Sequence, residues 1–214
     1  MTASAIADED IDRLRTIYQY GVEEVLTKIT ILRDEFEHSH DYSPIEHVRS
    51  RLKSKDSLVA KVERLECERS ISGIRETIRD IAGIRITCSF VADVYWIARM
   101  LERQPDLELL QVKDYIADPK PNGYRSLHLI VEVPVYLSRT TERVPVEVQI
   151  RTIAMDFWAS TEHKLNFKYG RGLSPQLISE LDDAARLAAD LDERMGRLRE
   201  QIRPHVPAAE STPR

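Results

Sequence analysis

The chain has 214 residues, which is enough to bury a sizeable core in one domain with helical additions. Its net charge of -5 at pH 7 argues against a general DNA-binding protein, because such a protein needs an excess of basic residues. The two cysteines have neither zinc nor redox spacing, which predicts a protein with reduced thiols. The sequence also has no apolar run near the ~20 residues of a membrane span and no signal-peptide pattern. We therefore expect a soluble, cytoplasmic protein.

The first predicted element is a long amphipathic helix in residues 1–40. Apolar residues recur at intervals of three and four from Ile11 to Phe36, and the pattern stops near His38. Such a stripe is typical of a helix that packs one side against a core.

A second helix is predicted after a strongly basic segment at residues 49–55. We expect Ser57 to cap this helix, because a serine side chain accepts a hydrogen bond from a backbone N–H group at a helix start. The helix is expected to run to about Arg69, and further helix or loop continues to Arg79.

Alternation of apolar and polar residues then predicts four strands. Successive side chains of a strand point to opposite faces, so each segment has one apolar and one polar face. The segments are residues 84–90, 108–116, 126–133 and 143–151, with a helix at about 92–103 between the first two. We expect an α+β fold with a mixed, mostly antiparallel sheet of about four to five strands, flanked by long N- and C-terminal helices.

The last predicted helix lies in residues 171–203, before a proline-rich tail at 204–214. Its apolar residues keep a four-three spacing over more than three heptads, which suits a coiled-coil seam between copies of the chain. Packing of this stripe on the chain's own sheet is the alternative, and both interpretations stay open. The stripe consists of Leu177, Leu181, Ala184, Ala188, Leu191, Met195, Leu198 and Ile202.

The turn at residues 118–128 carries unusual chemistry. Its two prolines and its Asn-Gly pair predict a tight turn, and an ordinary hairpin loop would explain them. A plain hairpin, however, gains nothing from crowding an aromatic ring with cations and an imidazole, whereas a pocket for a base and its phosphates needs them. We therefore favour a nucleotide pocket built from Lys120, Tyr124, Arg125 and His128.

The polar face of the predicted sheet is a second candidate region. A sheet with one apolar face normally leaves its other face in water, so solvent exposure is the simple interpretation. A face that is only exposed to water would be expected to carry mainly Lys and Glu, whereas this face carries short polar and basic groups. We therefore favour a concave polar site that forms an active-site cleft. The residues expected to converge there are Arg85, His128, Glu147, Gln149 and Arg151.

Two carboxylates are placed near these groups. Asp80 directly precedes the first predicted strand, and Glu147 lies on the polar face of the fourth. If those strands are neighbours, the two carboxylates meet beside basic residues. Carboxylates that face a nucleotide's phosphates are the usual ligands of Mg²⁺, and ordinary ion pairing is the alternative.

Four separated blocks of the sequence are Asp80-Ile-Ala-Gly-Ile-Arg85, residues 113–128, Glu147-Val-Gln149-Ile-Arg-Thr and residues 155–164. In their order and spacing they resemble the RelA/SpoT-type synthetase domain, and the resemblance covers roughly residues 45–170. The flanking helices are similar to those of single-domain small alarmone synthetases. The resemblance implies a nucleotidyltransferase-like fold, Mg²⁺ as cofactor, and transfer of pyrophosphate from ATP to the 3′-hydroxyl of GDP or GTP, giving ppGpp or pppGpp and AMP.

The resemblance also implies roles for particular residues. The catalytic carboxylates and Mg²⁺ ligands are Asp80 and Glu147, and Glu147 is the candidate base. The ATP site consists of Arg51, Lys53, Lys61, Arg64 and Arg85, with the first and last enclosing adenine. The GDP or GTP site consists of Lys113, Lys120, Asn122, Tyr124, His128 and Gln149, with the tyrosine stacked on guanine.

Further expectations come from the same resemblance. Small alarmone synthetases form homotetramers through their terminal helices, so an oligomer is expected, with control by product or RNA left open. His40-Asp41 is similar to the metal-binding pair of the family's hydrolase domain, but the rest of that domain is not found upstream. We therefore expect synthesis without hydrolysis, performed by a core domain at residues 41–170.

Two other functions remain as alternatives. A related pyrophosphotransferase could use another acceptor, such as a different purine nucleotide or an RNA 3′ end, but Asn122, Tyr124 and His128 favour a free guanine nucleotide. A non-catalytic nucleotide-binding or RNA-binding module would have no need of Asp80 and Glu147, and both are present.

Overall fold

The computed structural model describes residues 7–39, 42–169 and 174–202 of the chain. Its helices are α1 (Asp8–Ser39), α2 (Lys55–Arg64), α3 (Ile71–Thr77), α4 (Val91–Glu102), α5 (Ile153–Tyr169) and α6 (Pro175–Ile202). Its strands are β1 (His47–Leu52), β2 (Ala82–Cys88), β3 (Glu108–Asp114), β4 (Leu127–Tyr136) and β5 (Thr141–Thr152). None of the helices in these ranges combines the length and the apolar composition needed to cross a bilayer. His40, Asp41 and the predicted tail lie outside the described residues.

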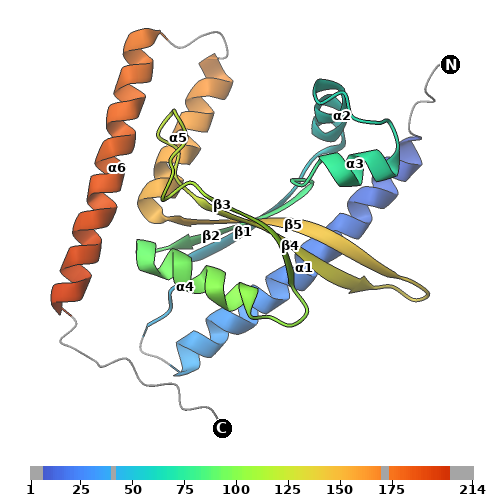
Figure 1. Ribbon diagram of the computed structural model, residues 1–214, viewed down its shortest axis with the longest axis horizontal. Helices are drawn as coiled ribbons and strands as arrows, with labels where there is room; N and C mark the ends of the chain where they lie inside the picture. The colour runs from blue at the N-terminus through green and yellow to red at the C-terminus, as the bar shows by residue number, and fades with distance from the viewer. Residues whose placement is uncertain (1–6, 40–41, 170–173, 203–214) are drawn as a thin grey trace.

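The strands form one mixed sheet, which confirms the expected α+β fold. Their order is β1-β2-β5-β4-β3. Strands β2 and β5 run parallel, and every other neighbouring pair runs antiparallel. The parallel pair lies at the centre of the arrangement in Figure 1 and joins two segments that are far apart in the sequence.

Helices α1 and α4 cover the apolar face of the sheet (Figure 1). Most of the residues predicted to point to this face are buried, and Ile86 and Val148 have no measurable exposure, whereas Phe90 is only partly buried. The fit between α1 and β5 is close, because a Cβ atom at Gly21 would lie 2.5 Å from Cγ1 of Val144. The main core therefore lies between these two helices and the sheet, and the polar face is directed away from it.

The region around the second helix differs from the prediction. The basic segment before it is an exposed edge strand, β1, which was not expected. Ser54, not Ser57, is the N-cap of α2, and its Oγ accepts a hydrogen bond from the backbone N of Ser57 at 3.3 Å. The helix ends at Arg64 rather than near Arg69, and Glu66 follows with a positive φ of 49°.

The second predicted strand also ends earlier than expected. Strand β3 stops at Asp114, whose Oδ1 accepts hydrogen bonds from the backbone N atoms of Ile116 at 2.9 Å and Ala117 at 3.0 Å. These bonds turn the chain, because an aspartate that bonds the backbone two residues on mimics a backbone turn. The turn begins the loop that leads to β4.

The C-terminal helix α6 lies beside α5 and reaches α4 (Figure 1). At its upper part, Nε1 of Trp158 donates a hydrogen bond to the carbonyl oxygen of Leu181 at 3.0 Å. Near its end, Arg199 forms an ion pair at 2.8 Å with Asp93, whose side chain is only 2% exposed. The same carboxylate accepts a hydrogen bond from the hydroxyl of Tyr42. Helix α6 is therefore held at both ends.

The apolar stripe of α6, which repeats every seven residues, does not face the sheet. Leu191 is 51% exposed and Leu198 is 47% exposed, whereas Ala185 and Asp192 are buried. The interpretation that the stripe packs on the chain's own sheet is therefore wrong. The helix packs within the chain mainly through another side, although Ala188 of the stripe lies partly buried against the cluster of Trp158, Ala159 and Ala185. The larger side chains of the stripe near the C-terminal end of α6 lie on the surface of the described residues.

Candidate active site

The strand register brings the predicted polar residues together. Arg85 on β2 lies opposite Gln149 on β5, and Gln149 lies opposite His128 on β4. Directly paired residues project from the same face of a sheet. Glu147 and Arg151 lie two positions to either side of Gln149 on β5, so they share that face. The expected convergence of these five side chains is confirmed.

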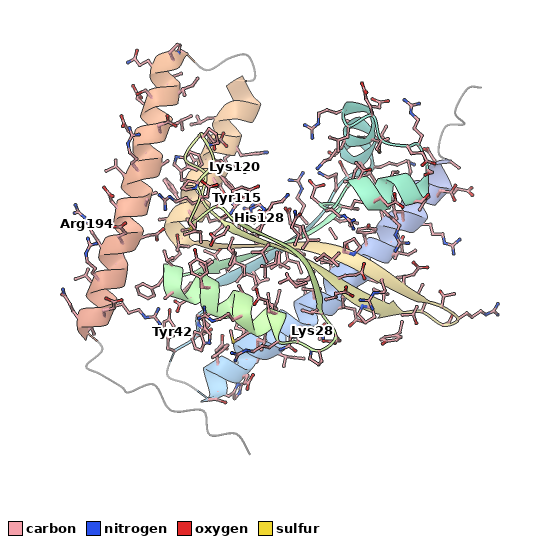
Figure 2. The ribbon with its side chains drawn as sticks, viewed as in Figure 1. Lys28, Tyr42, Tyr115, Lys120, His128 and Arg194 are labelled. Atoms are coloured by element: carbon pink, nitrogen blue, oxygen red, sulfur yellow. The ribbon has the colours of Figure 1, made fainter. Side chains whose placement is uncertain are left out.

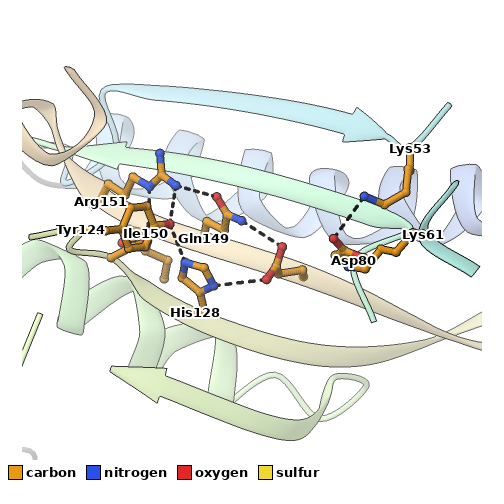
Figure 3. Close-up of polar contacts among 10 residues, drawn as sticks. Lys53, Lys61, Asp80, Tyr124, His128, Gln149, Ile150 and Arg151 are labelled. Carbon is orange, nitrogen blue, oxygen red and sulfur yellow. Dashed lines mark hydrogen bonds and ion pairs between the residues drawn. The ribbon is translucent and has the colours of Figure 1, made fainter. Parts of the chain in front are cut away.

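Five of the residues around this face form a closed ring of hydrogen bonds, which Figure 3 shows. Nη2 of Arg151 lies 2.5 Å from the hydroxyl of Tyr124 and 2.9 Å from Oε1 of Gln149. The Tyr124 hydroxyl lies 2.8 Å from Nε2 of His128, whose Nδ1 lies 3.2 Å from Oε1 of Glu147. Nε2 of Gln149 donates to Oε2 of Glu147 at 2.9 Å and closes the ring.

The groups at either side of this ring fix most of its bond directions. Arginine only donates, so the oxygen of Tyr124 accepts from Arg151. An ionised carboxylate only accepts, so Nδ1 of His128 donates its proton to Glu147. The bond between the Tyr124 hydroxyl and Nε2 of His128 can run in either direction, because the tyrosine oxygen has a second lone pair.

Glu147 is a half-enclosed carboxylate whose charge is stabilised. Its side chain is 18% exposed. Burial by itself raises the pKa of Glu147, but the hydrogen bonds from His128 and Gln149 outweigh it and hold that pKa below its usual value. The carboxylate is therefore ionised at neutral pH and able to accept a proton or bind a cation.

Asp80 is the second carboxylate of the site, and it is held by two lysines. Nζ of Lys61 lies 2.7 Å from Oδ1 of Asp80, and Nζ of Lys53 lies 3.2 Å from Oδ2 (Figure 3). Burial raises the pKa of Asp80, but the two ammonium groups outweigh it and leave that pKa below its usual value. Asp80 precedes β2, in which Gly83 pairs with Glu147, and the charge of Asp80 raises the pKa of Glu147. The two carboxylates therefore lie near enough for the charge of one to act on the other.

The carboxylate pair suits a cation that is shared with a nucleotide. Among the residues that the structure describes, no group of three or more His, Cys, Asp or Glu side chains is arranged to hold a metal ion. A cation bound by Asp80 and Glu147 would thus take its other ligands from water or from phosphate oxygens. Mg²⁺ has this preference, since it is usually bound through one or two carboxylates plus substrate phosphates. The donor set fits Mg²⁺.

The loop between β3 and β4 gathers aromatic rings and a lysine. Nζ of Lys120 lies 4.6 Å from the ring centre of Tyr115 and 4.9 Å from that of Tyr124. The ring of Tyr115 also meets His128 edge to face at 5.2 Å, and Figure 2 shows Tyr115, Lys120 and His128 clustered at this loop. Gly123 has a positive φ of 79°, a conformation that glycine adopts readily in a tight turn such as the one predicted here.

The remaining predicted guanine-side residues lie around the same loop. Lys113 is exposed on β3 and pairs in register with His128 on β4. Asn122 is exposed, and its Oδ1 accepts a hydrogen bond from the backbone N of Tyr124 at 3.3 Å. Arg125 instead donates to the carbonyl oxygen of Ile116 at 3.2 Å, which is a contact within the loop.

The predicted ATP-side residues come from β1, α2 and β2. Arg51 is exposed on β1 and pairs in register with Gly83. Arg64 is the last residue of α2, three positions after Lys61, so the two share a side of that helix. Nη1 of Arg85 contacts Oδ1 of Asp156 at 3.1 Å. Within the described ranges, the buried Nε of Arg85 has no hydrogen-bond partner.

Three residues that touch this site were not assigned a role from the sequence. Arg151 is 4% exposed and forms part of the ring, and Asp156 on α5 contacts both Arg85 and Arg151 at 3.1 Å. Tyr115 lies against Lys120 and His128. The alternation of β5 did place Arg151 on the polar face, but its partners depend on the fold of the distant loop.

The fold and the site together define a nucleotide-binding transferase: two carboxylates, several lysines and arginines and a ring-bearing loop share one face of a mixed sheet. Residues 50–172 match the family described as "Region found in RelA / SpoT proteins". The chain belongs to this family.

Two relatives and two solved structures are similar over nearly the whole chain. "GTP pyrophosphokinase YwaC" of Bacillus subtilis is 46% identical over 91% of this chain and 92% of its own length. "GTP pyrophosphokinase YjbM" of the same organism is 39% identical over 91% of each chain. Small alarmone synthetase 1 of Bacillus subtilis, bound to its product pppGpp, superimposes with a TM-score of 0.85 at 38% identity, covering 92% of this chain and 100% of its own. Small alarmone synthetase 2 superimposes with a TM-score of 0.82 at 46% identity, covering 90% and 99%.

Proposed function

We propose that this chain is a GTP pyrophosphokinase, which transfers pyrophosphate from ATP to the 3′-hydroxyl of GDP or GTP and releases AMP. The observation that carries the proposal is the position of the ionised Glu147 between a lysine-bound Asp80 and the aromatic loop that bears Tyr124. The proposal agrees with the similarity to YwaC and to a small alarmone synthetase that was solved with pppGpp.

Glu147 is the proposed general base. Its pKa lies below the usual value, so it is ready to accept a proton but is a weak base. We infer that the proton of the 3′-hydroxyl moves late, as the new bond to phosphorus forms and the hydroxyl becomes more acidic. A positioned base of this kind contributes ~10²–10⁴ in rate.

Asp80 and Glu147 are the proposed ligands of Mg²⁺, which when bound would neutralise charge on the nucleotide phosphates. Lys53 and Lys61 now neutralise Asp80 at 3.2 and 2.7 Å. Their long side chains allow them to contact the phosphates of ATP once a cation has taken their place. Because charge accumulates on phosphate oxygens in the transition state, these ammonium groups stabilise it directly.

On the guanine side, Tyr124 is proposed to stack on the base and Lys120 to contact its phosphates. Lys120 now lies over the ring of Tyr124, at 4.9 Å from the ring centre. An incoming base would displace this cation from the ring and release it toward the phosphates of the same nucleotide. Lys113, Asn122, His128 and Gln149 complete the proposed guanine site around the loop and strand β4.

On the ATP side, Arg51 and Arg85 are proposed to enclose adenine, and Arg64 to assist the two lysines at the phosphates. A guanidinium is planar and stacks on a π face, which a lysine cannot do. The side chain of Arg85 is 34% exposed and already oriented by Asp156, so it is partly ordered before adenine binds.

The larger organisation is also a proposal. We infer that residues 41–170 are the synthetase core, that the protein acts in the cytoplasm, and that it assembles as a homotetramer. The support for assembly is the exposed stripe of α6, in which Leu191 and Leu198 are about half exposed although they are apolar.

The proposal is tested by incubating the purified chain with Mg²⁺, GDP or GTP, and ATP labelled on either the α- or the γ-phosphate. Transfer of pyrophosphate moves the γ-label to the guanine nucleotide, whereas the α-label stays in AMP. Formation of ADP instead of AMP would mean single phosphate transfer. Failure to label either guanine nucleotide would refute the proposed function.

A further inference from the structure

Arg151 is a buried cation whose every hydrogen-bonding nitrogen has a partner. Nη1 contacts Oδ1 of Asp156 at 3.1 Å, and Nε lies 3.3 Å from Oγ of Ser126. Nη2 donates both to the hydroxyl of Tyr124 and to Oε1 of Gln149. An arginine with 4% exposure is held in one orientation by such a set of bonds, because each removes freedom from its planar group.

Two separate routes connect Arg151 to the proposed base. The short route passes through Gln149, whose amide accepts from Arg151 and donates to Oε2 of Glu147. The long route passes through Tyr124 and His128 and ends at Oε1 of the same carboxylate (Figure 3). Both routes begin at the single nitrogen Nη2. The orientation of both carboxylate oxygens therefore depends on one guanidinium.

Arg151 also decides the direction of the bonds that it makes to Gln149 and Tyr124. Its N–H group requires Gln149 to present the amide oxygen, so the amide nitrogen must face Glu147. It likewise requires the oxygen of Tyr124 to accept, while the carboxylate of Glu147 at the other end of this route requires the proton on Nδ1 of His128. A lysine has no planar fork and cannot serve both acceptors with the same geometry.

The position of Asp156 supports this interpretation. Its Oδ1 lies 3.1 Å from both Arg151 and Arg85, so it balances the charge of the buried guanidinium and bridges the two arginines. Arg85 belongs to the proposed adenine side. Arg151 thus contacts the guanine-side Tyr124 directly. It is connected to Glu147 through Gln149 and to Arg85 through Asp156.

We propose that Arg151 is a positioning residue of the pyrophosphotransfer reaction, an inference that rests on the proposed function. Its nitrogens all bond to protein groups, and it holds the carboxylate of Glu147 through Gln149 and through the pair of Tyr124 and His128. A base that is held at both oxygens meets the 3′-hydroxyl in one geometry. Tyr124 belongs to one of the two routes. A guanine stacked on its ring is therefore connected to Glu147, the proposed general base, through the imidazole of His128.

The test compares Arg151→Lys and Arg151→Gln with the same two changes at Arg143. Arg143 is a suitable control because it lies on the same strand and pairs with Glu132 and Glu108, away from the proposed site. Steady-state kinetics should give a kcat that is lower by about 10²-fold for either Arg151 variant, the loss expected when a reacting group is misplaced by about 1 Å. The KM for ATP should change by less than about threefold, and the Arg143 variants should keep the wild-type kcat.

Tyr124→Phe tests the same idea in a variant that keeps the ring and disturbs packing least. It removes only the hydroxyl, so kcat should fall by about tenfold while the KM for GTP changes little. Adding Arg151→Lys to Tyr124→Phe should lower kcat by a smaller factor than Arg151→Lys lowers it in the wild type, because the longer route is already broken. If Arg151 has only a structural role, the two factors by which kcat falls should multiply in the double variant.

The outcomes separate the two proposals. If the wild type forms labelled (p)ppGpp but Tyr124→Phe and a folded Arg151 variant both keep the wild-type kcat, the inference about Arg151 is overturned and the proposed function stands. Multiplicative losses in the double variant overturn the inference in the same way. If the wild type itself forms no product, the proposed function fails and the inference falls with it.

Discussion

Gly123 lies directly against Ala185, so that a Cβ atom at position 123 would come within 2.5 Å of the Cβ atom of Ala185. The loop that carries Tyr124 therefore rests on the C-terminal helix. Trp158 and Ala159 of α5 join Ala185 in a small buried cluster, against which Tyr124 packs. The orientation of the Tyr124 ring, which is proposed to stack on guanine, thus depends on α6 as well as on the loop itself.

This contact gives the first prediction. Gly123→Ala should lower the free energy of unfolding by about 1–2 kcal/mol, because an alanine is strained at a φ of 79°. It should also raise the KM for the guanine nucleotide more than the KM for ATP, since the new methyl group pushes the loop away from Ala185. Gly196→Ala is the matched control, because that glycine lies inside α6 with open space around it. The control should stabilise the protein by up to about 1 kcal/mol and leave both KM values unchanged.

Glu147→Gln should reduce turnover by at least about 10²-fold while leaving the fold intact, because it removes the proposed base and a metal-binding charge in a nearly isosteric change. Glu132→Gln is the control, since Glu132 is a carboxylate on the neighbouring strand that is paired with Arg143. Product formation and circular dichroism measure the two effects. Turnover by Glu147→Gln within tenfold of wild type would remove Glu147 from the mechanism.

Tyr124→Ala should weaken binding of the guanine nucleotide by ~1–3 kcal/mol, the range for stacking a base on an aromatic ring, with less effect on ATP. Calorimetry with GDP and with a non-hydrolysable ATP analogue measures both. Tyr136→Ala is the control, because that ring is 76% exposed at the far end of β4. Equal losses for the two nucleotides would mean that the two pockets are wrongly assigned.

Asp192 gives a prediction about pH. It lies on the buried side of α6 and accepts a hydrogen bond from Oγ1 of Thr152 at 2.7 Å. Burial raises the pKa of Asp192 from 3.8 to about 6. Its contribution to stability is therefore fully present below about pH 4 and is lost as the pH rises through about 6.

Asp192→Asn should consequently stabilise the protein at pH 7–8 by on the order of 1 kcal/mol after allowance for solvent screening, and this gain should vanish below about pH 4. Urea unfolding across this pH range measures the difference. The exposed Asp190→Asn on the same helix is the control. A gain for Asp192→Asn that is independent of pH would contradict the prediction.

Leu191→Glu tests the proposed assembly. Leu191 is 51% exposed, so the change should barely affect the stability of the monomer, but it should dissociate an oligomer by placing an unpaired charge in an apolar contact. Light scattering and a melting curve separate these effects. Arg194→Glu is the control, because Arg194 lies off the stripe and points away from α5 (Figure 2). A wild-type protein that is monomeric at micromolar concentration would refute the oligomer and leave the synthetase assignment untouched.

Strands β2, β4 and β5 are predictable from sequence because they lie inside the sheet, where one face must be apolar and the alternation is therefore strong. Strand β1 is an edge strand, and most of its residues are exposed, so burial imposes no such alternation on it. From the sequence, its arginines and serine indicate a basic segment but do not predict a strand. The direction in which the stripe of α6 faces was equally hidden, because a seven-residue spacing is the same for a contact within the chain and a contact between chains.

The candidate site divides in a similar way. The convergence of Arg85, His128 and Gln149 follows from alternation once the strands are neighbours, but the order of the strands does not follow from the sequence. The bond between Tyr124 and Arg151 joins a loop to a strand across 27 positions, so no local pattern contains it. Motif spacing therefore identifies which residues belong to the site, whereas their mutual contacts require the fold.

The ion pair of Asp93 with Arg199 has a consequence for how the protein is made. The two residues are 106 positions apart, and Asp93 belongs to a helix that the ribosome completes long before α6. Until Arg199 emerges, that carboxylate lacks its ion-pair partner, and within the described ranges it keeps the hydrogen bond from the hydroxyl of Tyr42. In a nascent chain, burial of the Asp93 carboxylate therefore costs free energy that the ion pair offsets only when the last turn of α6 has been made. Translation that stops short of this turn should yield a loosely closed chain and an easy substrate for proteases.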